Sequence, residues 1–236
     1  YILMHFHLKV GFGKRTFMNV LVTGGAGLIG SHVVDRFVQE GHQVSVLDNL
    51  STGTKKNINR EAVFYKLDIC STELERVFKR ERPAVIVHLA AQIDVRKSTE
   101  NPVLDANVNV IGTINLLQLA VKYGVRKVVF ASSGGAVYGE QHQFPAPEYH
   151  RNCPLSPYGI SKLCCEYYLE YFRHVAGLGY AALRFSNVYG PRQNPEGEAG
   201  VIAIFSKQLL EGQHPLIKGN GLQTRDYVYV RDVVES

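Results

Sequence analysis

One glycine-rich stretch, residues 23–30 with the sequence TGGAGLIG, constrains the fold more than any other part of the chain. It joins a short apolar run to a segment whose apolar side chains recur at helical spacing. Gly24 permits a tight turn, Gly27 lets the backbone approach a pyrophosphate, and Gly30 lets a helix pack close to a sheet. Phosphates bound there lie at a helix N-terminus, where free N–H groups and the helix dipole favour anions. The stretch therefore predicts a strand, a loop and a helix that together bind a dinucleotide.

Strand and helix patterns alternate along the chain as far as residue 187. Short, continuous apolar runs predict strands at 19–23, 43–48, 62–68, 84–90, 126–133 and 179–187. Helical periodicity and helix-ending residues predict helices at 27–41, 73–83, 108–124 and 156–177. Continuous apolar strands are typical of sheets that are covered on both faces. The alternation therefore predicts an α/β fold built on a doubly wound parallel sheet.

The second predicted strand ends in Asp48, at the spacing that a dinucleotide-binding unit requires. A carboxylate at this position accepts hydrogen bonds from the adenosine ribose hydroxyls and repels a 2′-phosphate. Asp48 therefore predicts NAD rather than NADP as the cofactor. Lys55 and Lys56 follow in the next loop and could counter this preference, although such a pair is more often a solvated face.

Tyr158 and Lys162 are four residues apart in a predicted helix, so both side chains lie on one face. An ammonium close to a phenol lowers the pKa of the phenol. Such a phenol can act as a general acid or base near neutral pH. The same spacing arises by chance on surface helices. This pair, however, follows the predicted dinucleotide loop and a strand that ends in two serines, which favours a catalytic role.

The charge distribution argues against nucleic acid as a partner. The chain of 236 residues has a formal net charge of +5, and residues 1–17 contribute Lys9, Lys14 and Arg15 without any acid. No basic run follows Met18. We therefore expect no nucleic-acid binding. We also expect no membrane span, because no uninterrupted apolar run approaches the roughly 18 to 20 residues that such a helix needs.

The cysteines indicate neither a metal site nor a disulfide scaffold. Four are present, and their spacing matches no metal-ligand motif. Four are also too few for a disulfide framework in a chain of this length. They are typical of reduced thiols and predict a cytoplasmic location. Their positions are Cys70, Cys153, Cys164 and Cys165.

Several longer motifs extend from Met18 to the C-terminus. They read TGGAGLIGSH, LDNLSTG, HLAAQIDVRKS, NVNVIGTINLL, SSGGAVYGE, SPYGISK, LRFSNVYGPRQ and TRDYVYVRDV. On these motifs the chain resembles the extended short-chain dehydrogenase/reductases, which have a Rossmann fold. Within that family it is similar to the NAD-dependent nucleotide-sugar epimerases and dehydratases, above all those of the UDP-glucose 4-epimerase type.

The resemblance implies a role for individual residues. The tyrosine and lysine of SPYGISK, Tyr158 and Lys162, are implied to be catalytic and to contact the cofactor. An arginine suits a diphosphate because its fork of donors matches phosphate oxygens. Implied substrate contacts are Ser133, Asn187 and Arg225. Asn187 could instead cap a strand end, and Arg225 could form a local ion pair with Asp226. The remaining implied cofactor contacts are Gly24, Gly27, Leu28, Ile29, Gly30, Asp48, Asn49, Asp68, Ile69, Ala90, Ala91, Gln92 and Asn109.

One position departs from the family pattern. Many relatives place a catalytic serine or threonine four residues before the tyrosine of VYG, and here that residue is Gly134. Ser133 precedes it by one position and Ser132 by two. We expect Ser133 to present the hydroxyl, because the two glycines can shift the backbone; Ser132 is the alternative.

The resemblance implies epimerisation at C4 of a nucleotide sugar, such as a UDP-hexose, by transient oxidation with NAD, in an enzyme that pairs as a homodimer. A 4,6-dehydratase is the nearest alternative, but it needs an acidic pair between the serine and VYG. The chain has Gly134, Gly135 and Ala136 there. The same absence argues against decarboxylating relatives. An NAD-binding protein without catalytic activity is a third possibility.

The patterns also predict how the chain is divided. Residues 1–17 are expected to be an extension, with an extra strand or arm as the alternative. Residues 18–186 form the predicted NAD-binding domain, and residues 187–236 the start of a small substrate-binding domain. The chain ends just as a helix begins, so we expect that second domain to be incomplete.

Overall fold

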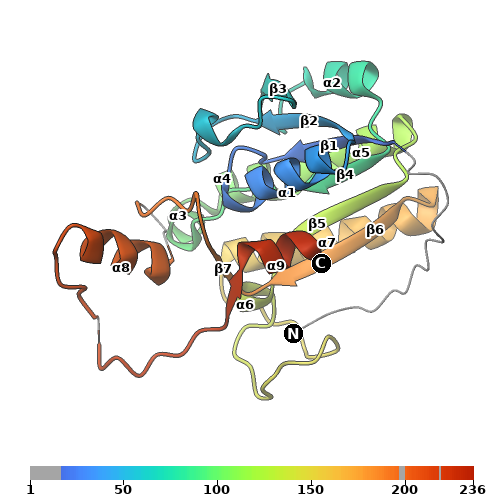
Figure 1. The fold of residues 1–236 in the computed structure, drawn as a ribbon. Coiled ribbons are helices and arrows are strands. Elements are labelled where there is room, and N and C mark those ends of the chain that lie inside the picture. Colours follow the sequence, from blue (N-terminus) through green and yellow to red (C-terminus); the bar gives the residue numbers. More distant parts are fainter. Residues whose placement is uncertain (1–16, 197–199, 218) are drawn as a thin grey trace.

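A six-stranded parallel sheet forms the centre of the fold (Figure 1). The computed structural model describes residues 17–196, 200–217 and 219–236, so the predicted extension lies outside the described residues apart from Phe17. The strand order is β3-β2-β1-β4-β5-β6. This is the order of a doubly wound dinucleotide-binding sheet, which confirms the predicted fold class. The strands are β1 (Asn19–Thr23), β2 (Gln43–Asp48), β3 (Val63–Lys66), β4 (Val85–His88), β5 (Lys127–Ser133) and β6 (Gly179–Phe185).

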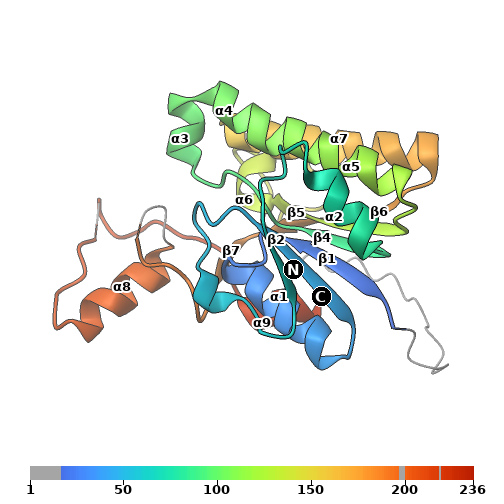
Figure 2. The same ribbon diagram turned by 90° about the horizontal axis from the view of Figure 1, so that it is seen from above.

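Helices cover both faces of this sheet (Figure 2). On one face lie α2 (Leu74–Glu81), α5 (Gly112–Lys122) and α7 (Pro157–Ala176). Their inward side chains share one apolar cluster with β1, β2, β4 and β5. The other face carries α1 (Leu28–Gln39) and α9 (Val230–Glu235), over a second cluster that is rich in valine. Burial on both faces explains why the strands are continuous apolar runs.

The connection between β4 and β5 is largely helical. It contains α3 (Val95–Glu100), α4 (Pro102–Ala106), the π-helix η2 (Asn107–Ile111) and α5. The last three form one apolar helix, Pro102–Lys122, that is long enough to cross a membrane by length and composition alone. Leu116, Leu117 and Ala120 of this helix are fully buried against the sheet, so packing within the fold accounts for part of its apolar character.

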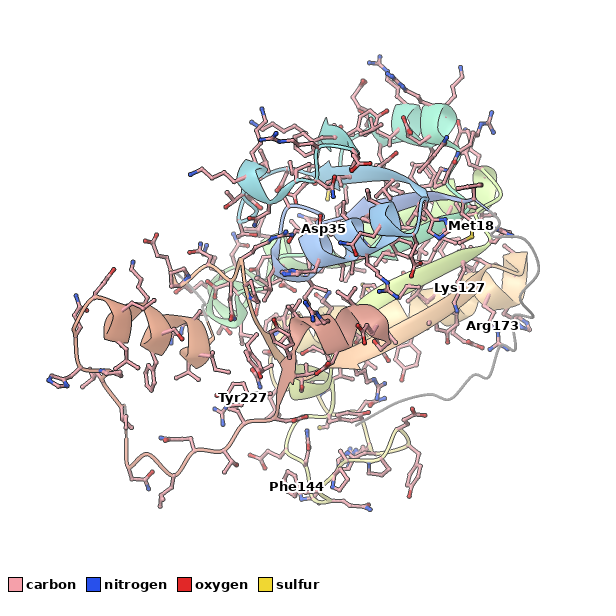
Figure 3. The ribbon with its side chains drawn as sticks, in the orientation of Figure 1. Met18, Asp35, Lys127, Phe144, Arg173 and Tyr227 are labelled. Atoms are coloured by element: carbon pink, nitrogen blue, oxygen red, sulfur yellow. The ribbon has the colours of Figure 1, made fainter. Side chains whose placement is uncertain are left out.

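The residues after β6 leave the main sheet. β7 (Asn187–Tyr189) pairs in parallel with β8 (Tyr227–Tyr229), on which Figure 3 labels Tyr227. Between them, α8 (Val201–Leu210) extends away from the sheet (Figure 1). The chain then returns to α1, where Val233 of α9 is buried. Arg192 also reaches back to α1, because its guanidinium lies 2.7 Å from Asp35. The domain boundary at residue 187 stays a prediction.

A matched pair of substitutions tests whether the helix Pro102–Lys122 belongs to the core. Leu116→Ala should lower the free energy of unfolding by about 2–5 kcal/mol, the usual loss when a buried leucine is truncated. Leu222→Ala, at a leucine that is 78% exposed, is the control and should change it by less than about 0.5 kcal/mol. Chemical denaturation measures both. Equal stabilities for the two variants would contradict the packing described for α5.

Candidate functional site

The glycine-rich loop joins β1 to α1 and leaves little room for side chains. Gly24 has a φ of +71°, and a Cβ there would approach the backbone nitrogen of Ala90 to 2.7 Å. A Cβ on Gly30 would meet the carbonyl oxygen of Gly24 at 2.2 Å, so the first turn of α1 packs directly on the loop. Gly27 is the N-cap of α1 and supplies no side-chain cap. The N–H groups of the first helical turn are therefore not capped by a side chain, as an anion site requires.

Asp48 secures this loop from the end of β2. Its side chain is buried, and Oδ2 accepts a hydrogen bond from the Ala26 N–H at 3.0 Å. Oδ1 accepts from the Leu50 N–H at 2.8 Å. The carboxylate thus holds the glycine-rich loop and the β2 loop together. The sequence pattern predicted only a contact with ribose for Asp48, and the structure adds this structural role.

The residues that are expected to border the adenine lie beside the same loop. The side-chain amide of Asn49 donates to Asp68 at 2.7 Å, and the Cys70 N–H donates to the other carboxylate oxygen at 2.8 Å. Burial by itself would raise the pKa of Asp68, but these hydrogen bonds hold it below its usual value. Ile69, next in sequence, is buried in the core cluster. The structure therefore brings Asn49 and Asp68 together, as expected for residues of one subsite.

A buried polar network follows the end of β4. The Gln92 N–H donates to Asn109 Oδ1 at 2.8 Å, and the Asn109 amide donates back to the Gln92 carbonyl at 3.0 Å. Asn109 lies in the π-helix η2. The Asp105 carboxylate accepts from both side-chain amides and from the Ser161 hydroxyl. Two predicted cofactor residues are thus tied to the helix that carries Tyr158 and Lys162.

His88, the last residue of β4, links this network to the glycine-rich loop. Its Nδ1 lies 2.7 Å from the Thr23 hydroxyl, and its Nε2 lies 3.0 Å from the Thr113 hydroxyl. Thr113 donates its proton to the carbonyl of Asn109, so its oxygen accepts from His88 Nε2–H. Nδ1 is then the acceptor for Thr23. Burial lowers the pKa of His88 to about 3, which keeps the ring neutral. Thr23 in turn accepts from the Leu89 and Ala90 N–H groups.

Tyr158, Lys162 and Ser133 meet where α7 passes the end of β5. The Lys162 ammonium is buried and donates to the Ala131 carbonyl at 2.8 Å. It lies 5.8 Å from the centre of the Tyr158 ring and 4.7 Å from that of Phe130. The Ser133 hydroxyl acts on the Tyr158 phenol in the direction that lowers its pKa. The predicted catalytic residues are therefore neighbours in space.

The sequence predicted that the pKa of Tyr158 lies below its usual value because of Lys162. For the chain without cofactor or substrate, this prediction is wrong. Burial raises the pKa of Tyr158 to about 12, and the charge of Asp105 acts in the same direction. The group that lowers it is the Ser133 hydroxyl. Burial also lowers the pKa of Lys162 to about 8, although the charge of Asp105 opposes this shift. Spacing along a helix placed the pair on one face but could not show that burial raises the pKa of Tyr158 and lowers that of Lys162.

Ser132 has a different partner from Ser133. Its hydroxyl donates to Glu166 on α7, and Glu166 also forms an ion pair with Arg184 of β6 at 2.6 Å. The Arg184 guanidinium stacks over the Tyr138 ring at 4.7 Å. This cluster fixes β5, β6 and α7 relative to one another. Of the two serines, the geometry thus favours Ser133 as the one that meets Tyr158.

Gly134 and Gly135 begin the short helix α6 (Gly134–Val137); Ser133 occupies its N-cap position, but its side chain makes no capping hydrogen bond. A Cβ on Gly134 would lie 3.1 Å from the Arg184 carbonyl, so a larger side chain there is constrained. A cleft of about 320 Å³ opens beside α6. It is lined by Val95, Gly135, Ala136, Gly139, Glu140, Leu155 and Ser156. Within the described residues, no cluster of ligands suited to a metal ion is found.

Asn187 is the first residue of β7, and Arg225 lies in the irregular segment directly before β8. Both are exposed. The Asn187 side chain donates to the Asp226 carbonyl at 3.0 Å, and the Arg225 guanidinium donates to the Thr224 carbonyl at 2.7 Å. The structure thus brings Asn187 beside the segment that contains Arg225. It places both outside the buried network around Asp105.

Sequence reasoning missed the residues that support the site. Asp105, Ser161, Glu166, Arg184 and His88 match no catalytic spacing. The available signal was chemical: polar and charged residues inside otherwise apolar helices and strands are rarely buried without a purpose.

Gly30→Ala tests the glycine-rich loop. The added Cβ cannot fit beside the Gly24 carbonyl, so the loop must move and its affinity for a dinucleotide should fall by about 10-fold or more, which corresponds to 1.4 kcal/mol. Gly135→Ala is the control, because a Cβ there meets no atom within 4 Å. Calorimetric titration with NAD measures both. Unchanged affinity in Gly30→Ala would show that the loop does not hold the dinucleotide.

Known proteins are similar to this chain in sequence and in fold. Residues 20–236 match the NAD dependent epimerase/dehydratase family. A UDP-glucose 4-epimerase of Mycolicibacterium smegmatis is 47% identical over 224 residues, which cover 93% of this chain and 72% of that protein. The structure of UDP-glucose 4-epimerase from Thermotoga maritima, determined with UDP-glucose, is 53% identical with a TM-score of 0.91 and covers 92% of this chain and 71% of that one.

A second solved structure bears on the cofactor. It is UDP-glucose 4-epimerase from Thermus thermophilus in complex with NAD, 47% identical with a TM-score of 0.87. The match covers 92% of this chain and 72% of that one. The family match over residues 20–236 includes the glycine-rich loop, the Tyr158 helix and the C-terminal residues. The chain therefore belongs to the NAD dependent epimerase/dehydratase family.

Proposed function

We propose that the chain catalyses NAD-dependent epimerisation at C4 of a nucleotide sugar, most closely a UDP-hexose. The observation that carries this proposal is the meeting of Tyr158, Lys162 and Ser133 at the sheet edge that also carries the glycine-rich loop. Parallel strands bring the loops after β1, β4 and β5 to the same edge. A group held by the loop after β1 can therefore meet the side chains that follow β5.

The residues present fit NAD. The glycine cradle leaves no room for a Cβ at Gly24 or Gly30, and the N-terminus of α1 has no side-chain cap, as a pyrophosphate site requires. Asp48, at the end of β2, would accept from the ribose hydroxyls. Asn49 and Asp68 would border the adenine, and Ala90, Ala91, Gln92 and Asn109 would line the rest. When bound, NAD supplies the hydride acceptor and a positive charge.

The chain's own side chains handle the proton. In its ionised form, which the positive charge of bound NAD would favour, Tyr158 would accept the proton of the sugar hydroxyl at its phenolic oxygen and return it when the keto sugar is reduced on its other face. Ser133 would hydrogen bond to the phenolic oxygen, and it acts to lower the pKa of Tyr158, which stabilises the ionised form. Lys162, held by the Ala131 carbonyl, provides a cation beside the Tyr158 ring. Together these groups position and exchange one proton, while the cofactor carries the hydride.

The substrate roles of Asn187 and Arg225 are part of this proposal. Arg225 offers a fork of donors suited to a diphosphate, and its exposed position leaves it accessible. The cleft beside α6 could receive the sugar. Gly134, Gly135 and Ala136 supply no acid there, which disfavours a dehydratase, although Glu140 lines the same cleft. Identification of the reaction product therefore distinguishes an epimerase from a dehydratase.

Pairing as a homodimer is also a proposal. Ile160, Tyr167, Tyr171 and Val175 are exposed apolar side chains on α7, and Ile111 and Val121 are exposed on the neighbouring helix. Figure 2 shows these helices side by side on the outer face of one layer. An exposed apolar face of this kind suits contact with a second copy of the chain. The cytoplasmic location predicted from the cysteines stays a prediction.

An assay with UDP-glucose and UDP-galactose tests the reaction. Tyr158→Phe should retain NAD affinity and lower turnover by a factor on the order of 100 or more, because a general acid and base is lost. Tyr149→Phe, at a tyrosine that is 86% exposed, is the control. Interconversion of the two sugars supports an epimerase. A 6-deoxy-4-keto product would identify a dehydratase, and NAD binding without any turnover would identify a non-catalytic protein.

Ser133→Ala tests the hydroxyl assignment through pH dependence. The hydrogen bond from Ser133 lowers the pKa of Tyr158, so its loss should raise that pKa. The rising limb of kcat/KM should therefore move to higher pH, and turnover should fall less than in Tyr158→Phe. Ser132→Ala should leave this limb in place, because Ser132 is bonded to Glu166. A shift in Ser132→Ala alone would move the role to Ser132.

A further inference from the structure

One carboxylate on α1, that of Asp35, contacts two segments that are far apart in the sequence (Figure 3). Its Oδ1 accepts a hydrogen bond from the Asn59 side-chain amide at 2.8 Å. Its Oδ2 accepts from the Arg192 guanidinium at 2.7 Å. Both carboxylate oxygens are therefore engaged, and the proposed reaction uses none of these three residues.

Asn59 belongs to the connection between β2 and β3, which packs on the glycine-rich loop. In this connection the Thr54 N–H and the Asn57 side-chain amide both donate to the Ala26 carbonyl at 3.1 Å. Further along, Asn59 donates to Asp35. The connection is thus attached to the glycine-rich loop at one point and to α1 at another. Asp35 is therefore part of the support of the proposed cofactor site.

Arg192 belongs to residues 187–196, here called the substrate segment because it begins with the proposed substrate contact Asn187. The backbone of Arg192 has a φ of +70°, a left-handed conformation that is disfavoured for a residue with a Cβ. Such a conformation persists only where surrounding contacts determine it. The ion pair with Asp35 is such a contact. Its side chains are 34% and 25% exposed, so water reaches them only in part.

A second contact restrains the substrate segment two residues earlier. Gly190 has a φ of +153°, and a Cβ there would lie 2.5 Å from the Val230 side chain. Val230 is buried at the start of α9, which packs on α1. Asn187 is in turn paired with Tyr227 of β8. The position of both strands relative to the glycine-rich loop therefore depends on how this segment rests on α1.

We propose that Asp35 is a positioning residue for the substrate: by accepting from Asn59 and Arg192 at once, its carboxylate fixes the substrate segment against the helix that follows the glycine-rich loop. The inference rests on the proposed function, because the position of this segment matters to the reaction only if the segment contacts a nucleotide sugar. The ion pair acts on substrate binding rather than on proton transfer, since α7 with Tyr158 lies on the other face of the sheet (Figure 2).

Four single substitutions separate the ion pair from other effects. Asp35→Asn removes the charge and turns one oxygen into an amide donor, so the side chain can accept from Asn59 or from Arg192, but not from both. Arg192→Met removes the guanidinium and keeps an apolar stem. Arg192→Lys is the rescue variant, because an ammonium can replace the single contact made by Nη2. Arg36→Met is the matched control: it is the next residue on α1, and it removes an ion pair with Glu40 at 2.8 Å.

Hydrogen exchange in the chain without ligands tests the ion pair. Amides of residues 187–196 should exchange about 5-fold faster in Asp35→Asn and in Arg192→Met, because the segment opens more readily. Exchange in Arg192→Lys should stay within about 2-fold of the unmutated chain, and Arg36→Met should not change it. The double variant of Asp35→Asn and Arg192→Met should exchange no faster than the faster single variant, because both changes remove one interaction. Unchanged exchange in both single variants, or multiplied effects in the double variant, would overturn the proposal.

Kinetics with UDP-glucose at saturating NAD test the role in substrate binding. Asp35→Asn and Arg192→Met should raise KM about 5-fold and leave kcat within about 2-fold, the pattern expected when binding is lost equally in the ground and transition states. NAD affinity should stay within about 2-fold. Faster exchange with an unchanged KM would overturn the substrate role. If the unmutated chain converts no UDP-glucose, the proposed function and the substrate role fail together, and hydrogen exchange still decides whether Asp35 holds the segment.

Discussion

Because β1, β4 and β5 lie side by side and run parallel, their carboxyl ends meet at one edge of the sheet. The glycine-rich loop, the segment around Gln92 and the serine pair all follow these three ends. Strand pairing therefore gathers residues that are separated by more than a hundred positions in sequence. The loops at the opposite edge carry none of the proposed site residues, as expected for an open parallel sheet, where ligands bind beyond the carboxyl ends.

Burial of polar groups is the second constraint, and it acts through hydrogen bonds. Thr23, His88, Thr113, Asn109 and Asp105 are all buried, and each has partners that satisfy it. A polar group left unpaired at such a position would cost about 1–3 kcal/mol. The network therefore admits few arrangements. It makes the end of β4, the π-helix and α7 one rigid support for the proposed cofactor and catalytic residues.

Tyr158 shows how two environmental effects compete at this support. Burial disfavours the phenolate and raises the pKa of Tyr158 to about 12, whereas the Ser133 hydrogen bond favours it. Lys162 experiences the converse effect, because burial disfavours its ammonium. Without cofactor or substrate, burial therefore disfavours the charged form of both groups. A site of this kind responds strongly to added charge, because low-dielectric surroundings screen electrostatic interactions poorly.

The sequence by itself determined the parallel α/β fold and the glycine-rich loop, and it predicted Tyr158, Lys162 and Ser133 as site residues. The fold, the loop and the pairing of Tyr158 with Lys162 depend on local rules: apolar runs, helical spacing and the absence of a side chain at Gly24 and Gly30. Ser133 was predicted from the family resemblance. Only the tertiary structure decided that Ser132 bonds to Glu166 and that Asp105 reaches Ser161 from 56 positions away. Such contacts depend on how helices and strands pack. The sign of the pKa shift of Tyr158 also required the structure, because it depends on burial, and burial is a property of the whole fold rather than of neighbouring residues.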